Sequence, residues 1–173
     1  KGVCYGFNRG VDLVTGQWVE FLNSGDFLYN SAVLSDIFSG KKIDVDGVYG
    51  SMVGCVDGQR VLVEAHENVE EKAWQGMRLI HETLFVKAEI MKKFKFDTRY
   101  IVSCDGDFVL KCVASGYKFS KVNVVVYEAQ AQGFSAKHWL LARKENWQIT
   151  RKYFPGLQTD IFHLRGLVYF VTF

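Results

Sequence analysis

Hydrophobic positions recur along the chain with two different periods, and each period predicts a different kind of element. A spacing of three to four residues predicts helices over 3–14, 32–38, 87–94, 105–115 and 136–154. Short apolar or alternating runs predict strands over 18–22, 45–56, 60–65, 82–86 and 119–127. Because strands and helices alternate, the pattern indicates an α/β domain with a mixed sheet flanked by helices.

Composition and charge narrow the class of protein. The chain has 173 residues, of which 49% are hydrophobic and 23% charged, and this balance excludes an intrinsically disordered protein. Its 21 Lys and Arg against 19 Asp and Glu give a net charge of +2, which does not favour nucleic acid as a partner. We expect one domain over 1–154. Residues 155–173 are expected to form its apolar C-terminal extension, in which the ten-residue apolar run 164–173 is too short to cross a bilayer and should pack on the core as a strand or helix.

The four cysteines are expected to be reduced. They are Cys4, Cys55, Cys104 and Cys112, and no two of them form a C-x-x-C pair, so the spacing of a structural zinc site is absent. Four cysteines in a chain of this length also do not make a disulfide scaffold. We therefore predict four free thiols in a cytosolic compartment.

A polar turn that follows the predicted strand 18–22 is the first candidate site, and it ends in Asp26. Ligand sites of α/β proteins lie at the carboxyl ends of strands. A carboxylate there suits a hard cation such as Mg²⁺ or Mn²⁺, which also takes phosphate oxygens and water as ligands. Asp26 also suits a plain capping role in the turn. The residues alone leave both interpretations open.

A second candidate site lies at the start of the predicted helix 105–115, where Asp105 and Asp107 occupy the first turn. A carboxylate at the positive end of a helix dipole can act as a general base toward a hydroxyl, but the same residues are also ordinary helix caps. His81 stands before a short predicted strand, a position that a hydrogen-bonded core histidine also occupies. The sequence contains no zinc-hydrolase, serine-hydrolase, phosphate-loop or dinucleotide-binding motif.

Collinear blocks of sequence point to a known family. The blocks are K-G-V-C-Y-G-F-N-R-G at 1–10, V-T-G-Q-W-V-E-F-L-N-S-G-D at 14–26, H-E-T-L-F at 81–85, F-D to D-G-D-F-V-L over 96–110, and Q-G-F-S at 132–135. In order and spacing they resemble the family-2 glycosyltransferases of the GT-A fold, especially bacterial enzymes of surface-polysaccharide assembly. One such block would be weak, but together they cover most of residues 1–150.

The resemblance implies an inverting transfer of a sugar from a UDP- or GDP-linked donor to a hydroxyl of a glycan or lipid-linked acceptor. It implies that Asp26 holds Mg²⁺ or Mn²⁺ as the cofactor, that Asp105 is the general base, and that Asp107 orients this base or the acceptor. Residues 132–135 correspond to a loop that closes over the donor. Asp26, His81 and Asp105 should converge on one cleft. The donor and acceptor cleft as a whole is expected to include Asn8, Asn23, Ser24, Gly25, His81, Gly133 and Ser135.

The sequence also departs from the family pattern. Gly6 and Gly25 stand where the family carries acidic residues, and no P-T-Y-N-like strand precedes Lys1. We therefore expect an incomplete, C-terminal portion of a GT-A-like domain; the alternative is a non-catalytic glycan- or nucleotide-binding relic of the same fold. The resemblance further implies a cytoplasmic location with peripheral association at the inner face of the membrane. An unpaired sheet edge would favour a homodimer.

Overall fold

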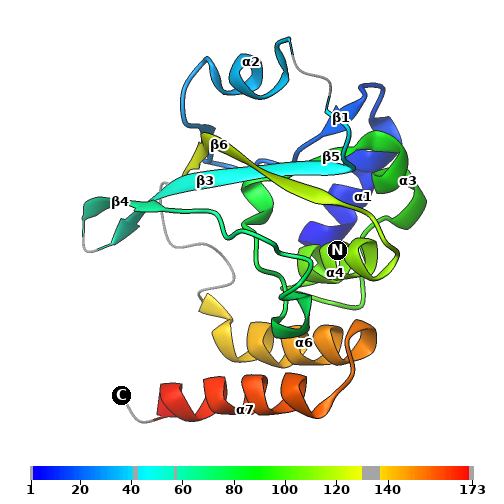
Figure 1. Ribbon diagram of the computed structural model, residues 1–173, viewed down its shortest axis with the longest axis vertical. Helices are drawn as coiled ribbons and strands as arrows, with labels where there is room; N and C mark the ends of the chain where they lie inside the picture. The colour runs from blue at the N-terminus through cyan, green and yellow to red at the C-terminus, as the bar shows by residue number, and fades with distance from the viewer. Residues whose placement is uncertain (1, 41–42, 57, 130–136, 172–173) are drawn as a thin grey trace.

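A mixed sheet lies at the centre of the computed structural model, which describes residues 2–40, 43–56, 58–129 and 137–171 (Figure 1). Within these ranges the sheet has six strands: β1 (Trp18–Val19), β2 (Phe27–Leu28), β3 (Gly47–Val56), β4 (Gln59–Val63), β5 (Phe85–Lys87) and β6 (Phe119–Glu128). The strand order is β1-β5-β3-β6-β2, and β4 pairs with β3 beside this path. β3 and β6 run parallel, whereas the other pairs are antiparallel. The predicted α/β class with a mixed sheet is confirmed.

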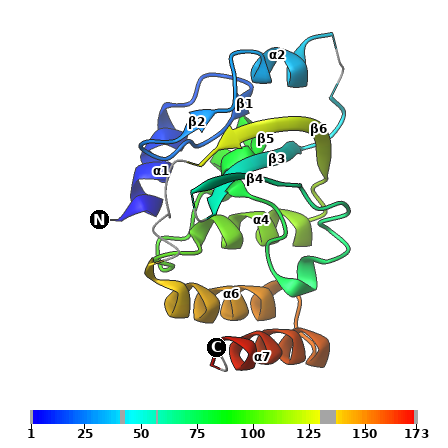
Figure 2. The ribbon, with the colours of Figure 1, turned by 90° about the vertical axis from the view of Figure 1, so that its left-hand side faces the viewer.

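Helices form layers on both faces of the sheet (Figures 1 and 2). Their bounds are α1 (Val3–Leu13), α2 (Val33–Phe38), α3 (Ala88–Phe94), α4 (Cys104–Ala114), α6 (Trp139–Tyr153) and α7 (Leu157–Val171). α2 covers one face, α1, α3 and α4 cover the other, and α6 and then α7 form further layers beyond α4. All but α7 match helices predicted from apolar spacing, and α7 is formed by the predicted apolar extension. No helix in the described ranges is long and apolar enough to cross a membrane.

The predicted strand over 18–22 is shorter in the structure, where β1 ends at Val19. Phe21 turns its ring into the core between the sheet and the helices. The centroid of this ring lies 4.8 Å from that of Phe7 and 5.6 Å from that of Phe96. Packing of aromatic rings therefore overrides the local apolar pattern at this edge of the sheet.

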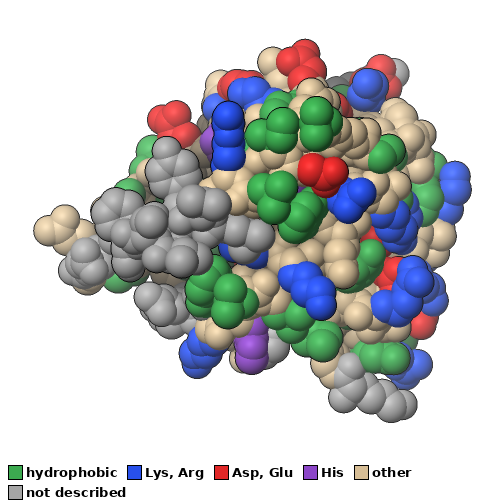
Figure 3. Space-filling view, turned by 90° about the horizontal axis from the view of Figure 1, so that it is seen from below, with side chains coloured by type: hydrophobic (Ala, Val, Ile, Leu, Met, Phe, Trp, Pro, Cys, Tyr) green, Lys and Arg blue, Asp and Glu red, His purple; other side chains and the backbone are tan. Residues whose placement is uncertain are grey.

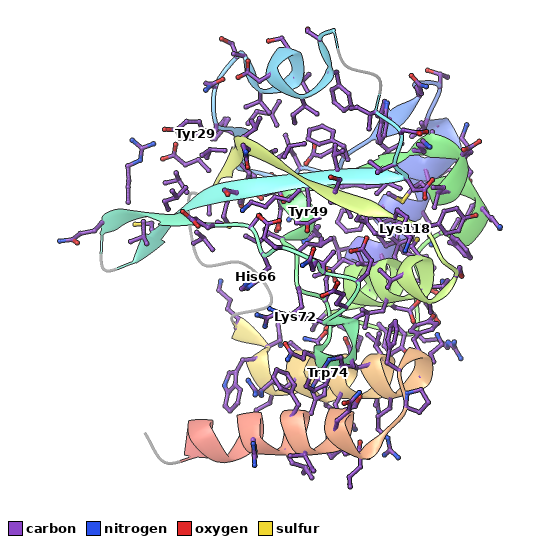
Figure 4. The ribbon with its side chains drawn as sticks, in the orientation of Figure 1. Tyr29, Tyr49, His66, Lys72, Trp74 and Lys118 are labelled. Atoms are coloured by element: carbon purple, nitrogen blue, oxygen red, sulfur yellow. A yellow bond between two sulfur atoms is a disulfide. The ribbon has the colours of Figure 1, made fainter. Side chains whose placement is uncertain are left out.

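The connection after β4 is tied to the underside of the sheet. Tyr49 on β3 is buried, and its hydroxyl donates to the carbonyl of His66 at 2.8 Å (Figure 4). The chain then passes through the 3-10 helix η1 (Ala73–Gln75), which lies against α6 and α7. This connection therefore links the sheet layer to the two C-terminal helices.

A disulfide joins the amino-terminal ends of α1 and α4. It pairs Cys4 with Cys104, whose Cα atoms are 6.3 Å apart although the residues are separated by 100 positions. The prediction of four free thiols is therefore wrong for these two residues and holds for Cys55 and Cys112. Cysteine spacing could not reveal the pair, because only the packing of α1 against the start of α4 brings the two together.

Candidate functional site

A cleft of about 760 Å³ opens beside the sheet, within the usual size range of ligand sites. It brings together segments that are distant in the sequence: the turn 23–26, residues 80–82, residues 102–105, and Ala142 and Asn146 of α6. Asp26, His81 and Asp105 all line this cleft. The structure therefore has the convergence of these three side chains that the sequence analysis predicts.

The turn that carries Asp26 directly precedes β2. The backbone N–H of Asp26 donates to the carbonyl of Asn23 at 3.1 Å, and Gly25 has a φ of 94°, which residues with a side chain rarely adopt. The cleft lining also includes three further residues that were predicted for it, Asn23, Ser24 and Gly25. The hydroxyl of Tyr127, from β6, donates to the Asp26 carboxylate. Burial and this bond together raise the pKa of Tyr127.

His81 lies between two carboxylates in the cleft wall. It begins the 3-10 helix η2 (His81–Thr83), which replaces the start of the strand predicted over 82–86. Its Nδ1 lies 3.1 Å from Oε2 of Glu82 and 3.1 Å from Oδ2 of Asp105. Burial works to lower the pKa of His81, but the hydrogen bond to Asp105 and the surrounding carboxylate charges outweigh it and raise the pKa to about 9. At neutral pH the ring is therefore a cation.

Glu20 is a half-buried acid that was not among the residues predicted from the sequence. Burial raises the pKa of Glu20 to about 7; the positive charge of His81 opposes this shift, while the charges of Glu82 and Asp26 add to it. Its Oε1 atom has no hydrogen-bond partner among the described residues. A single carboxylate inside the apolar run 18–22 is the signal that identifies such a residue, because unpaired acids are rarely buried without a role.

Glu82 connects the two sides of the cleft. The Nδ2 of Asn23 donates to Oε1 of Glu82 at 3.2 Å, while the other oxygen of Glu82 faces His81. Burial raises the pKa of Glu82. A continuous set of contacts thus runs from the turn before β2, through Glu82 and His81, to Asp105 at the start of α4.

Glu145 of α6 fixes the segment that leads into α4. Its buried carboxylate accepts three backbone hydrogen bonds, from Ile101 at 2.8 Å, Val102 at 2.9 Å and Ser103 at 2.9 Å. These N–H groups precede the helix and lack helical partners, so the carboxylate satisfies donors that would otherwise be unpaired. Because Asp105 follows within two residues, Glu145 holds the helix start that carries it.

Asp107 lies on a different side of α4 and is not among the residues that line the cleft. It has no exposed surface, and its Oδ1 accepts hydrogen bonds from Nζ of Lys152 at 2.8 Å and from the hydroxyl of Tyr153 at 2.9 Å. A two-residue step on a helix turns a side chain by about 200°, which accounts for the separation from Asp105. In place of the expected contact with base or acceptor, Asp107 joins α4 to α6.

Asn8, which was predicted to line the cleft, has a structural role. Its Nδ2 donates to the carbonyl of Phe96 at 2.9 Å, and its Oδ1 accepts from the N–H of Phe96 at 2.8 Å. This pair of bonds ties α1 to the segment after α3 and leaves Asn8 outside the cleft lining. Gly133 and Ser135, with the loop 132–135, lie outside the described residues.

The cleft offers oxygen ligands to a cation. In the described ranges, no group of three or more His, Cys, Asp or Glu side chains is arranged to hold a metal ion. Mg²⁺ does not require such a group, because it binds through one or two carboxylates and takes phosphate oxygens and water for the rest. Asp26, with Glu20 and Glu82 close enough to interact with it electrostatically, fits this type of ligand set.

Comparison with known proteins supports one class of activity. No family model matches the chain. The PGL/p-HBAD biosynthesis glycosyltransferase of Mycobacterium bovis BCG is 28% identical over 127 residues, covering 66% of the chain and 45% of that protein. The amylovoran biosynthesis glycosyltransferase AmsB of Erwinia amylovora is 27% identical over 168 residues, covering 84% and 55%. The chain is similar to glycosyltransferases.

The chain spans about half the length of the curated relatives it matches. Among solved structures, it matches S. aureus TarS 1–349 in complex with UDP with a TM-score of 0.51, over 84% of the chain and 48% of the TarS chain. The sequence identity of this match is 14%, so it shows a shared fold. The curled mixed sheet flanked by helices is therefore a fold that the chain shares with TarS.

Proposed function

We propose that the protein containing this chain is a family-2 glycosyltransferase of the GT-A type. It transfers a sugar from a nucleotide-sugar to a hydroxyl of a glycan or lipid-linked acceptor, with inversion. The observation that carries the proposal is the meeting of Asp26, His81 and Asp105 in one cleft. The relatives' names refer to amylovoran and PGL/p-HBAD biosynthesis, and UDP is bound in the TarS structure. Both support a biosynthetic transfer from a UDP-linked donor.

Asp105 is the proposed general base. The acceptor oxygen bonds to the anomeric carbon while the bond from that carbon to the diphosphate oxygen breaks. The acceptor proton passes to Asp105, and the electron pair leaves with the diphosphate. His81 contacts Oδ2 of Asp105, so it orients the carboxylate and leaves Oδ1 to receive the proton. Glu145 acts as a positioning residue, because it fixes the segment before the helix start.

Asp26 is the proposed ligand of Mg²⁺ or Mn²⁺. When bound, such an ion supplies positive charge to the leaving diphosphate. Asp26 lies in a tight turn whose neighbours Asn23 and Ser24 also line the cleft, so the turn can offer polar groups to the phosphates. The half-buried acids Glu20 and Glu82 interact electrostatically with Asp26, and a cation bound there would favour their ionised forms.

The test is glycosyl transfer by the protein that contains this chain, with UDP- and GDP-sugars as donors. The Asp105→Asn variant should lose about 10²–10⁴-fold in turnover, the usual effect of removing a general base, while its donor dissociation constant in calorimetry stays unchanged. Asp12→Asn is the matched control, since it makes the same change in an exposed ion pair with Lys95. Full turnover by Asp105→Asn would contradict the proposal, as would an unsubstituted protein that binds no nucleotide-sugar.

A further inference from the structure

Acidic side chains are concentrated around one histidine of the cleft. On the face of the molecule seen from below, Asp and Glu are scattered among basic and hydrophobic side chains (Figure 3). In the cleft wall, by contrast, three carboxylates act together on the charge of His81: those of Asp105, Glu82 and Glu20. Such a grouping of acids beside a proposed general base points to a role in the reaction.

His81 offers one proton to two carboxylates. Its Nδ1 atom carries a single hydrogen, yet Oε2 of Glu82 and Oδ2 of Asp105 each lie 3.1 Å from that atom. A hydrogen bond from a charged nitrogen to a carboxylate is normally about 2.7–2.9 Å long. Nε2 serves neither acid, because it is enclosed and has no hydrogen-bond partner in the part of the chain that the structure describes. The two acids therefore share the Nδ1 proton, and whatever strengthens one bond weakens the other.

The backbone on both sides of this shared proton is held in place. In η2, the N–H and the hydroxyl of Thr83 both donate to the carbonyl of Ile80, at 3.0 and 2.8 Å. On the other side, Glu145 accepts from the backbone N–H groups that precede Asp105. A change in how the proton is shared therefore comes from the side chains and their contacts.

Asn23 connects the shared proton to the turn that carries Asp26. Its Nδ2 donates to Oε1 of Glu82 at 3.2 Å, and its carbonyl accepts from the N–H of Asp26. While the amide binds Glu82, that carboxylate is partly satisfied, and Asp105 keeps a share of the Nδ1 proton. When a phosphate oxygen takes the amide instead, Glu82 loses a donor and binds the proton more tightly. Asp105 then loses part of a hydrogen bond and becomes a better proton acceptor.

We propose that Glu82 is a positioning residue that makes the base respond to the donor. The inference rests on the proposed function, since it takes Asp105 as the base and the turn with Asn23 as a contact for phosphate. When the diphosphate of the donor engages Asn23, Glu82 draws the Nδ1 proton of His81 toward itself and frees Oδ2 of Asp105. The base is therefore strongest when the donor is in place, and the two sides of the cleft are coupled.

Proton NMR of the His81 ring, in the protein that contains this chain, tests the coupling. The Nδ1–H resonance is assigned by its loss in His81→Gln. Calorimetry shows whether UDP or GDP binds in the presence of Mg²⁺, and spectra are compared without nucleotide and at saturation. The resonance of the unsubstituted protein should move on binding. In Glu82→Gln, which lacks the competing charge, it should stay in place, and turnover should fall about fivefold, the effect of one hydrogen bond.

Asn23→Ala breaks the same link from its other end and gives an independent test. Because the amide is absent, the Nδ1–H resonance of this variant should lie, without nucleotide, close to its position in the nucleotide-bound protein. Glu64→Gln is the matched control, since it makes the same change as Glu82→Gln at an exposed position. In this control the resonance should move on binding as it does in the unsubstituted protein.

The possible results separate this inference from the proposed function. If neither nucleotide binds, the proposed function fails, and the role of Glu82 fails with it. If a nucleotide binds but the His81 resonance does not move, or moves equally in Glu82→Gln, only the role of Glu82 is overturned. Circular dichroism verifies that each variant is folded. If Glu82→Gln does not fold, Asn23→Ala decides, and a resonance unchanged by that substitution overturns the inference.

Discussion

Replacing Asp107 with asparagine should destabilise the protein without altering any residue of the cleft. Asp107 has no exposed surface, and its carboxylate lies between Nζ of Lys152 at 2.8 Å and Nζ of Lys111 at 3.3 Å. The hydroxyl of Tyr153 donates to the same carboxylate at 2.9 Å. An amide of nearly the same shape keeps the bond from Tyr153 but removes the negative charge between the two ammonium groups.

The expected loss follows from the burial of this carboxylate. Removing one partner of a buried ion pair costs about 3–5 kcal/mol. Two features reduce this figure: Lys152 and Lys111 are partly exposed and can regain water, and the amide still accepts a hydrogen bond from Tyr153. We therefore expect the free energy of unfolding to fall by about 2–4 kcal/mol. For a chain of this length, that corresponds to a fall in Tm of about 4–16 °C.

Urea unfolding followed by circular dichroism measures this loss, provided that the slope of the free energy with urea is unchanged. Asp12→Asn is the control, because it removes an aspartate from an exposed pair with Lys95 and should shift the midpoint far less. In a double-mutant cycle, Asp107→Asn and Lys152→Met should show a coupling of about 1 kcal/mol or more. An Asp107→Asn variant within about 0.5 kcal/mol of the unsubstituted protein would refute the reasoning.

Three further predictions concern the cleft and its supports. The free energy of unfolding should fall as pH rises between about 6.5 and 9, because His81 holds its proton more tightly in the folded protein; its contribution is complete below 6.5 and is lost as pH rises through 9. Unfolding curves at several pH values measure this slope, and His81→Gln should remove it. Reducing the disulfide between Cys4 and Cys104 should cost about 2–5 kcal/mol, since it closes a loop of 100 residues. Urea unfolding with and without dithiothreitol tests this, and Cys55→Ser, at an exposed free thiol, should change nothing. Asp26→Ala should abolish Mn²⁺-dependent donor binding in calorimetry, and an unchanged Mn²⁺ affinity would remove Asp26 from the proposed metal site.

The spacing of apolar residues along the sequence was sufficient to predict most helices and strands of the fold. The apolar spacing over 3–14 and 105–115 predicts α1 and α4 to within a residue at each end, because both helices pack apolar residues into the same hydrophobic core. The collinear blocks also predict that Asp26 and Asp105 share a cleft. Such blocks carry information about position that the amino-acid types alone lack, since a capping role suits each aspartate equally well.

Features that depend on contacts between distant segments could not be predicted in this way. The partners of Glu145 are backbone N–H groups, which leave no trace in the amino-acid sequence. The pairing of Cys4 with Cys104 depends on how α1 meets α4, and the partial burial of Glu20 likewise depends on tertiary packing. In each case the local sequence allows an exposed side chain, and only tertiary packing decides otherwise.

The contacts that α6 makes with α4 have a consequence for the order of folding. Glu145 binds the amides before α4, and Lys152 binds Asp107 in its first turn; these contacts join residues 42 to 45 positions apart. Contacts of such long range form only after the intervening chain has closed into a loop. The segments bearing Asp26, His81 and Asp105 therefore emerge from the ribosome before the helix that organises them. Helix and strand content should consequently recover ahead of ligand binding during refolding.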